Sequence, residues 1–175
     1  DSYCFNEEYF CFSYDFDDKN IKKYGLFYNV HCINQSDSIV PEGYRLSSYD
    51  DWCDLIKSLG SNVPKDKYSQ SEVLIKLKSQ KGWPGKIAFT NPLTGSNESG
   101  FTALPGGYLE HVMMPTIFHG KGQSVHWWTS DYATVCVSEY DKGIFTLKTA
   151  KNTDRYFDLK HSAFKEGKYM RLIKL

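Results

Sequence analysis

The sequence lacks an excess of charge of either sign and lacks any long apolar run. Its 175 residues contain 21 lysines and arginines against 21 aspartates and glutamates, so the formal net charge is zero. Binding of nucleic acid or of an anionic membrane through overall charge needs a basic excess, so this composition argues against both. No apolar stretch approaches the roughly 20 residues of a membrane-spanning helix. The length favours a single globular domain over residues 1–175.

Motifs built on cysteine pairs are also missing. None of the five cysteines forms a C-x-x-C pair, which argues against zinc ribbons and thioredoxin-like chemistry. Cys4 and Cys11 lie close together in an irregular stretch, and we expect them to close a short disulfide loop outside the cell. Cys32, Cys53 and Cys136 lie in apolar surroundings, so we expect them to be buried. Because five is odd, at least one thiol stays reduced or pairs with another chain.

Catalytic motifs are equally scarce. Residues 122–125 (GQSV) lack the second glycine of a hydrolase nucleophile elbow. Three histidines fall between positions 111 and 126 at spacings that match no helix or tight hairpin, so we interpret them as surface and core residues. The acidic run 15–18 lacks the glycine and the distal glutamate of an EF-hand. We therefore expect a protein that is not an enzyme and has no cofactor.

Aromatic residues, by contrast, are abundant. They make up 16% of the chain, with 13 tyrosines, 11 phenylalanines and 4 tryptophans. Such residues suit the pleated surfaces of a β-rich core. They also suit a surface on which sugar rings stack, and the composition leaves both alternatives open.

One helix is well defined by its sequence. Ser47 or Ser48 can cap it, and Ser48 with Asp51 has the spacing of a capping box. The apolar residues that then fall on one helical face are Trp52, Leu55, Ile56 and Leu59. Gly60 ends the pattern.

A second helix is expected over 71–78, with Val73, Leu74 and Leu77 facing inward. The first 23 residues are expected to be irregular, and 41–43 (PEG) to form a turn. The expected strands are 24–33, 87–90, 100–104, 124–129, 134–139, 143–149 and 169–173. Helices early and strands late indicate an α+β fold.

Several segments carry a resemblance to a known family. In chain order they are YGLFY (24–28), PEGYRL (41–46) followed by Asp51 and Trp52, SNESGFTALPGGY (96–108), WWTS (127–130) and YMRL (169–172). The segment 96–108, which we call the signature loop, runs from Asn, Ser and Gly through a short apolar stretch into a Pro-Gly-Gly break. Together these segments resemble the Fibrobacter succinogenes major paralogous domain, a bacterial cell-surface family.

The resemblance implies a C-type-lectin-like fold, with two helices, an antiparallel sheet and long loops. It also implies a place outside the cell or at a bacterial cell surface. The calcium motifs of sugar-binding lectins, Glu-Pro-Asn or Gln-Pro-Asp with Trp-Asn-Asp, do not occur in the chain. Asn97 and Glu98 could supply oxygen ligands to calcium, or they could form a capped turn before Gly100.

The chain departs from the family pattern at two places. Relatives carry cysteines where this chain has Val40 and Leu172, and we infer that an apolar contact here replaces their disulfide. Relatives also begin with a strand pair that contains Gln-x-Trp-Met-x-x-Asn-Leu, which precedes the first residue of this sequence. Without that strand pair we expect a sheet edge open to pairing.

The best candidate for a binding surface is the loop 109–126, because long loops on a rigid scaffold commonly carry function. The residues that we expect to bind a ligand are His111, Met114, Phe118 and His119 in this loop, with Trp83 and Trp127. We expect a non-catalytic binding or adhesion module, with a glycan or a surface protein as its partner. Exposed tryptophans would favour the glycan. The alternative is an assembly subunit that forms homo- or hetero-oligomers through protein–protein contacts.

Overall fold

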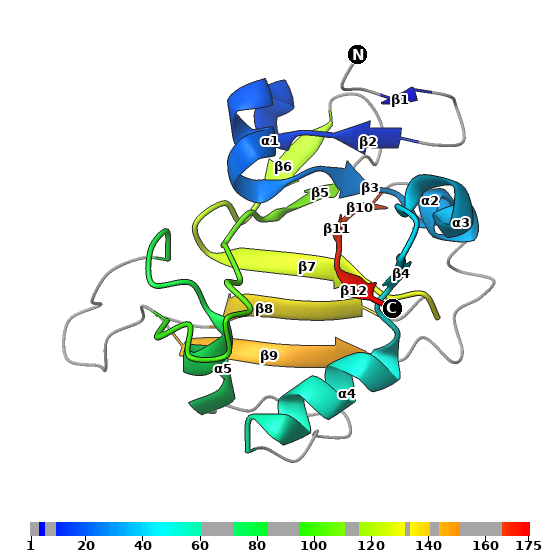
Figure 1. The fold of residues 1–175 in the computed structure, drawn as a ribbon. Coiled ribbons are helices and arrows are strands. Elements are labelled where there is room, and N and C mark those ends of the chain that lie inside the picture. The colour runs from blue at the N-terminus through cyan, green and yellow to red at the C-terminus, as the bar shows by residue number, and fades with distance from the viewer. Residues whose placement is uncertain are drawn as a thin grey trace.

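The computed structural model describes residues 4–5, 10–60, 72–83, 95–110, 116–131, 134–140, 144–150 and 166–175. The helices come from the first half of these ranges and the long strands from the second (Figure 1). The α+β class predicted from the sequence is therefore confirmed. In the described ranges, no helix combines the length and the apolar character needed to cross a membrane.

The helices are η1 (Tyr14–Phe16), α1 (Asp18–Tyr24), α2 (Val30–Asn34), α3 (Ser36–Ile39), α4 (Tyr49–Ser58) and α5 (Glu72–Leu77). Two of them confirm the predicted helices. In α4 the capping box of Ser48 and Asp51 is formed, and Gly60 follows the helix at φ 94°. In α5 the buried residues are Val73, Leu74 and Leu77, as the apolar spacing predicted. Both helices contact the main sheet, α4 at β8 (Thr134–Tyr140) and α5 at β9 (Ile144–Ala150).

The main sheet has the strand order β11-β7-β8-β9. Its strands are β7 (Ser124–Trp128), β8 (Thr134–Tyr140), β9 (Ile144–Ala150) and β11 (Tyr169–Met170). The first three run antiparallel in chain order, whereas β11 runs parallel to β7. Predicted strands at 124–129, 134–139 and 143–149 are thus confirmed. The predicted strand at 169–173 is broken at Arg171 into β11 and β12.

In the part of the chain that the structure describes, three smaller sheets accompany the main one. They are β1-β2-β3 (Cys4–Phe5, Phe10–Phe12 and Phe27–Tyr28), β10-β5-β6 (Glu166–Gly167, Tyr108–Glu110 and Ile117–His119) and β12-β4 (Leu172–Lys174 and Tyr44–Leu46). The C-terminal strands join them, because β10 pairs with β5, β11 with β7 and β12 with β4. Figure 1 shows this red segment running down between the N-terminal elements and the main sheet.

The described residues form two apolar core clusters. The larger one contains a group of aromatic rings in which Trp52 lies 5.0 Å from Trp127 and 5.2 Å from Phe101, measured between ring centroids. The smaller one is centred on Trp128, which is 1% exposed, and includes Val30, Ile33 and Leu46 with Met170 and Leu172 packed against them. The abundant aromatics therefore serve the core to a large extent.

Three sequence expectations about secondary structure are wrong. The first 23 residues include α1, because Asp17 caps the helix by accepting a hydrogen bond from the amide of Lys19. Only the middle of the predicted strand 24–33 is extended; α2 follows because Asn29 caps it through the amide of Cys32. Residues 100–104 form no strand, and only an isolated parallel bridge joins Ala103 to Lys78. The predicted strand 87–90 lies outside the described residues.

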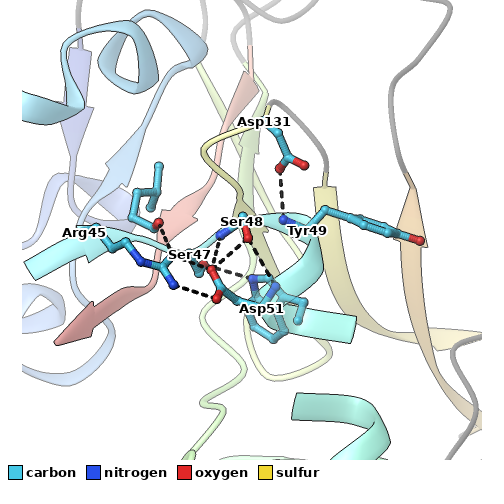
Figure 2. A network of polar contacts seen from close by, with 8 residues as sticks. Arg45, Ser47, Ser48, Tyr49, Asp51 and Asp131 are labelled. Atoms are coloured by element: carbon cyan, nitrogen blue, oxygen red, sulfur yellow. Dashed lines mark hydrogen bonds and ion pairs between the residues drawn. The ribbon is translucent and has the colours of Figure 1, made fainter. Parts of the chain in front are cut away.

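A polar network fixes the start of α4 (Figure 2). Arg45 on β4 forms a bidentate pair with Asp51, in which Nη2 lies 2.7 Å from Oδ1. The same carboxylate accepts hydrogen bonds from the amide and the hydroxyl of Ser48, at 2.7 and 2.8 Å. The amide of Tyr49 donates to Asp131, beyond β7, at 3.0 Å. These contacts hold α4, β4 and the end of β7 together.

Replacing Asp51 with Asn is expected to lower the free energy of unfolding by about 1–2 kcal/mol at pH 7, because the helix loses its capping box and its charge pair. The Arg45 guanidinium holds the pKa of Asp51 far below its ordinary value. The stabilisation is therefore complete above about pH 4 and is lost as the pH falls further. Urea unfolding of both proteins at pH 7 and pH 3 measures this difference. Equal stability at pH 7 would contradict the assignment.

Candidate functional site

A pocket of about 400 Å³ lies where the N-terminal elements, the signature loop and the C-terminal strands meet. Its walls come from residues 23–28, 39–40, 101–104, the strand β7 and residues 169–172. The volume falls in the range of small-molecule sites. The pocket thus contains residues from four of the five segments on which the family resemblance depends.

Side chains from opposite ends of the chain give this pocket its chemistry. Lys23, in the last turn of α1, lies with its ammonium 4.8 Å from the centroid of the Tyr24 ring. Arg171, between β11 and β12, places its guanidinium carbon 4.2 Å from the centroid of the Phe101 ring and donates from Nη2 to the Phe101 carbonyl at 3.2 Å. Tyr24, Tyr28 and Phe101 are among the residues that line the pocket. The pocket is therefore aromatic and basic.

Two consecutive glycines explain why the signature loop takes its course along the pocket. A Cβ at Gly106 would clash with the hydroxyl of Tyr169, which donates to the Gly106 carbonyl at 2.9 Å. Gly107 has φ 80°, and a Cβ there would clash with the carbonyl of His119. Only glycine fits both positions. Burial raises the pKa of Tyr169, so its phenol stays protonated as a hydrogen-bond donor.

The rim of the pocket is held by Asn97. Its side-chain oxygen accepts a hydrogen bond from the amide of Thr102 at 2.6 Å, and its amide donates to the Thr102 hydroxyl at 2.9 Å. Asn97 and Thr102 have φ 55° and 58°, a left-handed conformation that is strained for a β-branched residue such as threonine. Asn97 therefore holds Thr102 in a strained conformation at the pocket wall.

These contacts bear on the calcium alternative at Asn97 and Glu98. The side chain of Asn97 is engaged within the loop, and that of Glu98 lies 3.9 Å from the ammonium of Lys76. The geometry is that of a closed turn before Gly100, which was the second alternative. Across the described ranges, no three acidic, histidine or cysteine side chains converge as a metal ion would require.

The structure describes four of the six residues predicted to bind a ligand, and of these four only Trp127 lines the pocket. Trp83 is 5% exposed and donates from its indole nitrogen to the Ala103 carbonyl at 2.9 Å. Trp127 is 6% exposed and lines the pocket from within the core. This burial weakens the expectation that either ring stacks against a sugar at the surface. His111 and Met114 lie outside the described residues.

The remaining two predicted residues lie on β6, away from the pocket. Phe118 is half-buried and packs against Tyr14, with ring centroids 5.0 Å apart. His119 stacks on Tyr108 at 5.0 Å, and its Nε2 lies 3.2 Å from a carboxylate oxygen of Glu110. Burial, with Glu110 and Glu166 nearby, raises the pKa of Tyr108. This phenol is therefore protonated at neutral pH and unsuited to act as a base.

The predicted disulfide between Cys4 and Cys11 is not formed, since the described residues contain no disulfide bond. The backbones of the two cysteines nevertheless face each other across the β1–β2 ladder. The three other cysteines, Cys32, Cys53 and Cys136, are buried, as their apolar surroundings predicted.

Val40 and Leu172, which replace a cysteine pair of the relatives, both line the pocket. Leu172 also packs against the Trp128 cluster. The two positions therefore border the same pocket. Direct contact between them stays a prediction.

The comparison with protein families identifies the chain. The family described as the Fibrobacter succinogenes major domain matches residues 1–171, a range that includes every segment of the pocket up to Arg171. The chain belongs to this family. No curated protein matches it, and no solved structure matches it either.

Membership in the Fibrobacter succinogenes major domain family confirms the resemblance found in the sequence. No motif in the sequence, however, predicted that Lys23 and Arg171 would line one pocket. The distance of about 150 positions between them hides this proximity, which depends on the parallel pairing of β11 with β7. Arg171 is the one charged residue in the predicted strand 169–173, and this is the signal that could have drawn attention to it.

Proposed function

We propose that this chain is a non-catalytic binding module that recognises a glycan in the pocket between α1, the signature loop and Arg171. The observation that carries this proposal is the pocket itself, about 400 Å³ in volume with aromatic walls and two basic residues. Aromatic faces suit the apolar faces of sugar rings, and a few polar groups at the edge of a pocket supply orientation and specificity.

The chemistry of the pocket supports binding more than catalysis. Its titratable side chains among the described residues are Lys23, Arg171 and tyrosines. The pKa of Tyr169 is raised by burial and Arg171 is a permanent cation, so neither is a base at neutral pH. General acid–base catalysis needs a group whose pKa lies near the working pH.

We further propose that the fold is C-type-lectin-like and that the protein acts outside the cell or at a bacterial cell surface. Support for the fold comes from α4, α5 and the main sheet, which together with the long signature loop match the arrangement that the resemblance implies. Support for the place of action comes from the family to which the chain belongs.

The test is binding to a panel of plant and microbial polysaccharides, first with calcium and then with a chelator. We expect saturable binding to at least one polysaccharide and a loss of at least tenfold in affinity on replacing Tyr24 with Ala, because the half-buried Tyr24 ring lines the pocket. Tyr44→Ala is the matched control, since Tyr44 is 43% exposed and does not line this pocket. Loss of binding with the chelator would assign a role to calcium.

Absence of binding by a folded protein would overturn the glycan proposal and favour the second candidate, an assembly subunit. A specific observation supports that candidate. Phe16 and Ile117 are 49% and 47% exposed, and Ile117 lies on β6, an edge strand of the sheet β10-β5-β6. Exposed apolar side chains beside an open strand edge suit pairing with another chain. Light scattering on the purified protein would detect such association.

A further inference from the structure

The two cations of the pocket differ from several other described basic residues, because those residues form ion pairs with acidic side chains. Lys168 lies 2.7 Å from Glu166, Lys57 lies 3.2 Å from Asp54, and Arg45 is paired with Asp51. Neither Lys23 nor Arg171 has a carboxylate within ion-pair distance in the described part of the chain, and no acidic residue of that part lines the pocket. The pocket therefore concentrates positive charge although the whole chain is neutral.

Arg171 is held in place but keeps capacity to bind. Its guanidinium lies over the ring of Phe101, and Nη2 donates one hydrogen bond to the Phe101 carbonyl. Arg171 also borders a neighbouring cavity that Asp51 and Trp52 line. A guanidinium has five N–H donors in a planar fork, so most of them remain for a ligand. The side chain is exposed at the surface, where a ligand can reach it. Partial desolvation lowers its pKa, and no acid offsets that cost.

We propose that the pocket binds its glycan through a carboxylate, with Arg171 as the group that takes it in a bidentate pair and Lys23 as a second cation. The proposal rests on the function proposed above and names the substrate class: acidic saccharides, whose rings carry a uronic acid group. The fork of an arginine matches the two oxygens of a carboxylate. The rings of Tyr24 and Tyr28 and the apolar side chains of Leu104 and Met170 line the rest of the pocket for the sugar.

A pair of ligands that differ only in charge tests the proposal on the unaltered protein. Trigalacturonate carries three carboxylates, and its fully methyl-esterified form carries none while the sugar rings are the same. We expect trigalacturonate to bind at least tenfold more tightly by calorimetry at low salt, and the difference to shrink as ionic strength rises. Equal affinity for the two ligands would overturn the carboxylate proposal and leave the glycan function standing.

Variants then assign the residues. Arg171→Gln is expected to weaken trigalacturonate binding at least tenfold, and Arg171→Lys to restore part of it, because lysine keeps the charge without the fork. Lys23→Gln is expected to have a smaller effect of about threefold, since an exposed ammonium is screened by water. Lys57→Gln is the control with the same change of charge, as Lys57 is exposed and distant from the pocket lining. Circular dichroism verifies that each variant is folded.

Three further outcomes would each count against the proposal in a distinct way. Unchanged affinity of a folded Arg171→Gln variant would remove Arg171 from the site. Triglutamate could bind more tightly than trigalacturonate, with a loss of that binding in Arg171→Gln. This result would show that the carboxylate belongs to a protein partner and not to a glycan. No binding of any saccharide, neutral or acidic, would overturn the proposed function together with this inference.

Discussion

Replacing Trp128 with Ala is expected to lower the free energy of unfolding by about 3–5 kcal/mol. The side chain is 1% exposed and forms the centre of the smaller apolar cluster. Its indole nitrogen donates to the Tyr28 carbonyl at 2.8 Å, and the ammonium of Lys168 lies 3.8 Å from its ring centroid. A single domain is stable by about 5–15 kcal/mol, so this one change removes a large share of the total.

The reason for so large an effect is that Trp128 links parts of the chain that are far apart in sequence. Its hydrogen bond reaches β3, 100 residues earlier. Met170 and Leu172, on either side of Arg171, pack against its cluster and also line the pocket. Loss of the indole therefore leaves a cavity beneath the C-terminal strands that hold Arg171. We expect ligand affinity to fall along with stability.

Urea unfolding followed by far-UV circular dichroism measures the change. Trp128→Phe is the graded comparison: it keeps most of the apolar surface and loses the indole donor, so a cost of about 1–2 kcal/mol is expected. Tyr44→Ala controls for removal of an exposed aromatic and is expected to stay within about 0.5 kcal/mol of the original. A Trp128→Ala protein as stable as Tyr44→Ala would contradict this account of the core.

The elements with strong periodicity could be predicted from the sequence, and the weakly patterned ones could not. The helix α4 has both a capping box and an apolar face, and the antiparallel strands β7–β9 are rich in β-branched and aromatic residues. The first 34 residues lack such periodicity, and there single side chains decide the structure. Asp17 and Asn29 each begin a short helix by capping one amide, and one cap residue is a weak signal in an aromatic stretch.

The candidate site was harder to predict because tertiary pairing creates it. The motif segments pointed to the signature loop, and residues 101–104 do line the pocket. The tryptophans that seemed suited to stacking are buried instead, because burying a large aromatic surface stabilises the fold and their spacing in the sequence says nothing of exposure. Lys23 and Arg171 line one pocket because strands close to the C-terminus pair with β7, and no local pattern encodes this pairing.

No pattern in the sequence predicted the buried lysine Lys78. Its replacement is expected to have the second large effect on the free energy of unfolding. Lys78 follows α5 and is 3% exposed, with its ammonium 4.7 Å from the centroid of the Trp83 ring. Desolvation lowers the pKa of Lys78 to about 8, whereas an unfolded lysine has a pKa near 10.4. The folded chain therefore releases this proton at a lower pH than the unfolded chain does.

The direction of the pH dependence follows from this difference. Between about pH 8 and pH 10 the unfolded chain holds a proton that the folded chain has lost, so the free energy of unfolding rises with pH across this window. The penalty for burying the charge is fully present below pH 8, and the gap between the two pKa values corresponds to about 3 kcal/mol at most. Lys78→Met removes the charge and keeps a long apolar side chain.

We therefore expect Lys78→Met to raise the free energy of unfolding by about 1–3 kcal/mol at pH 7 and by much less at pH 10. Other lysines, tyrosines and cysteines titrate in the same window, so the informative quantity is the difference between the two proteins at each pH. Lys57→Met, at an exposed position, is expected to show a constant difference near zero. If the curves for Lys78→Met and the original protein ran parallel from pH 7 to pH 10, Lys78 would keep an ordinary pKa in the fold. The charge beside Trp83 would then be solvated, and its burial would have no energetic consequence.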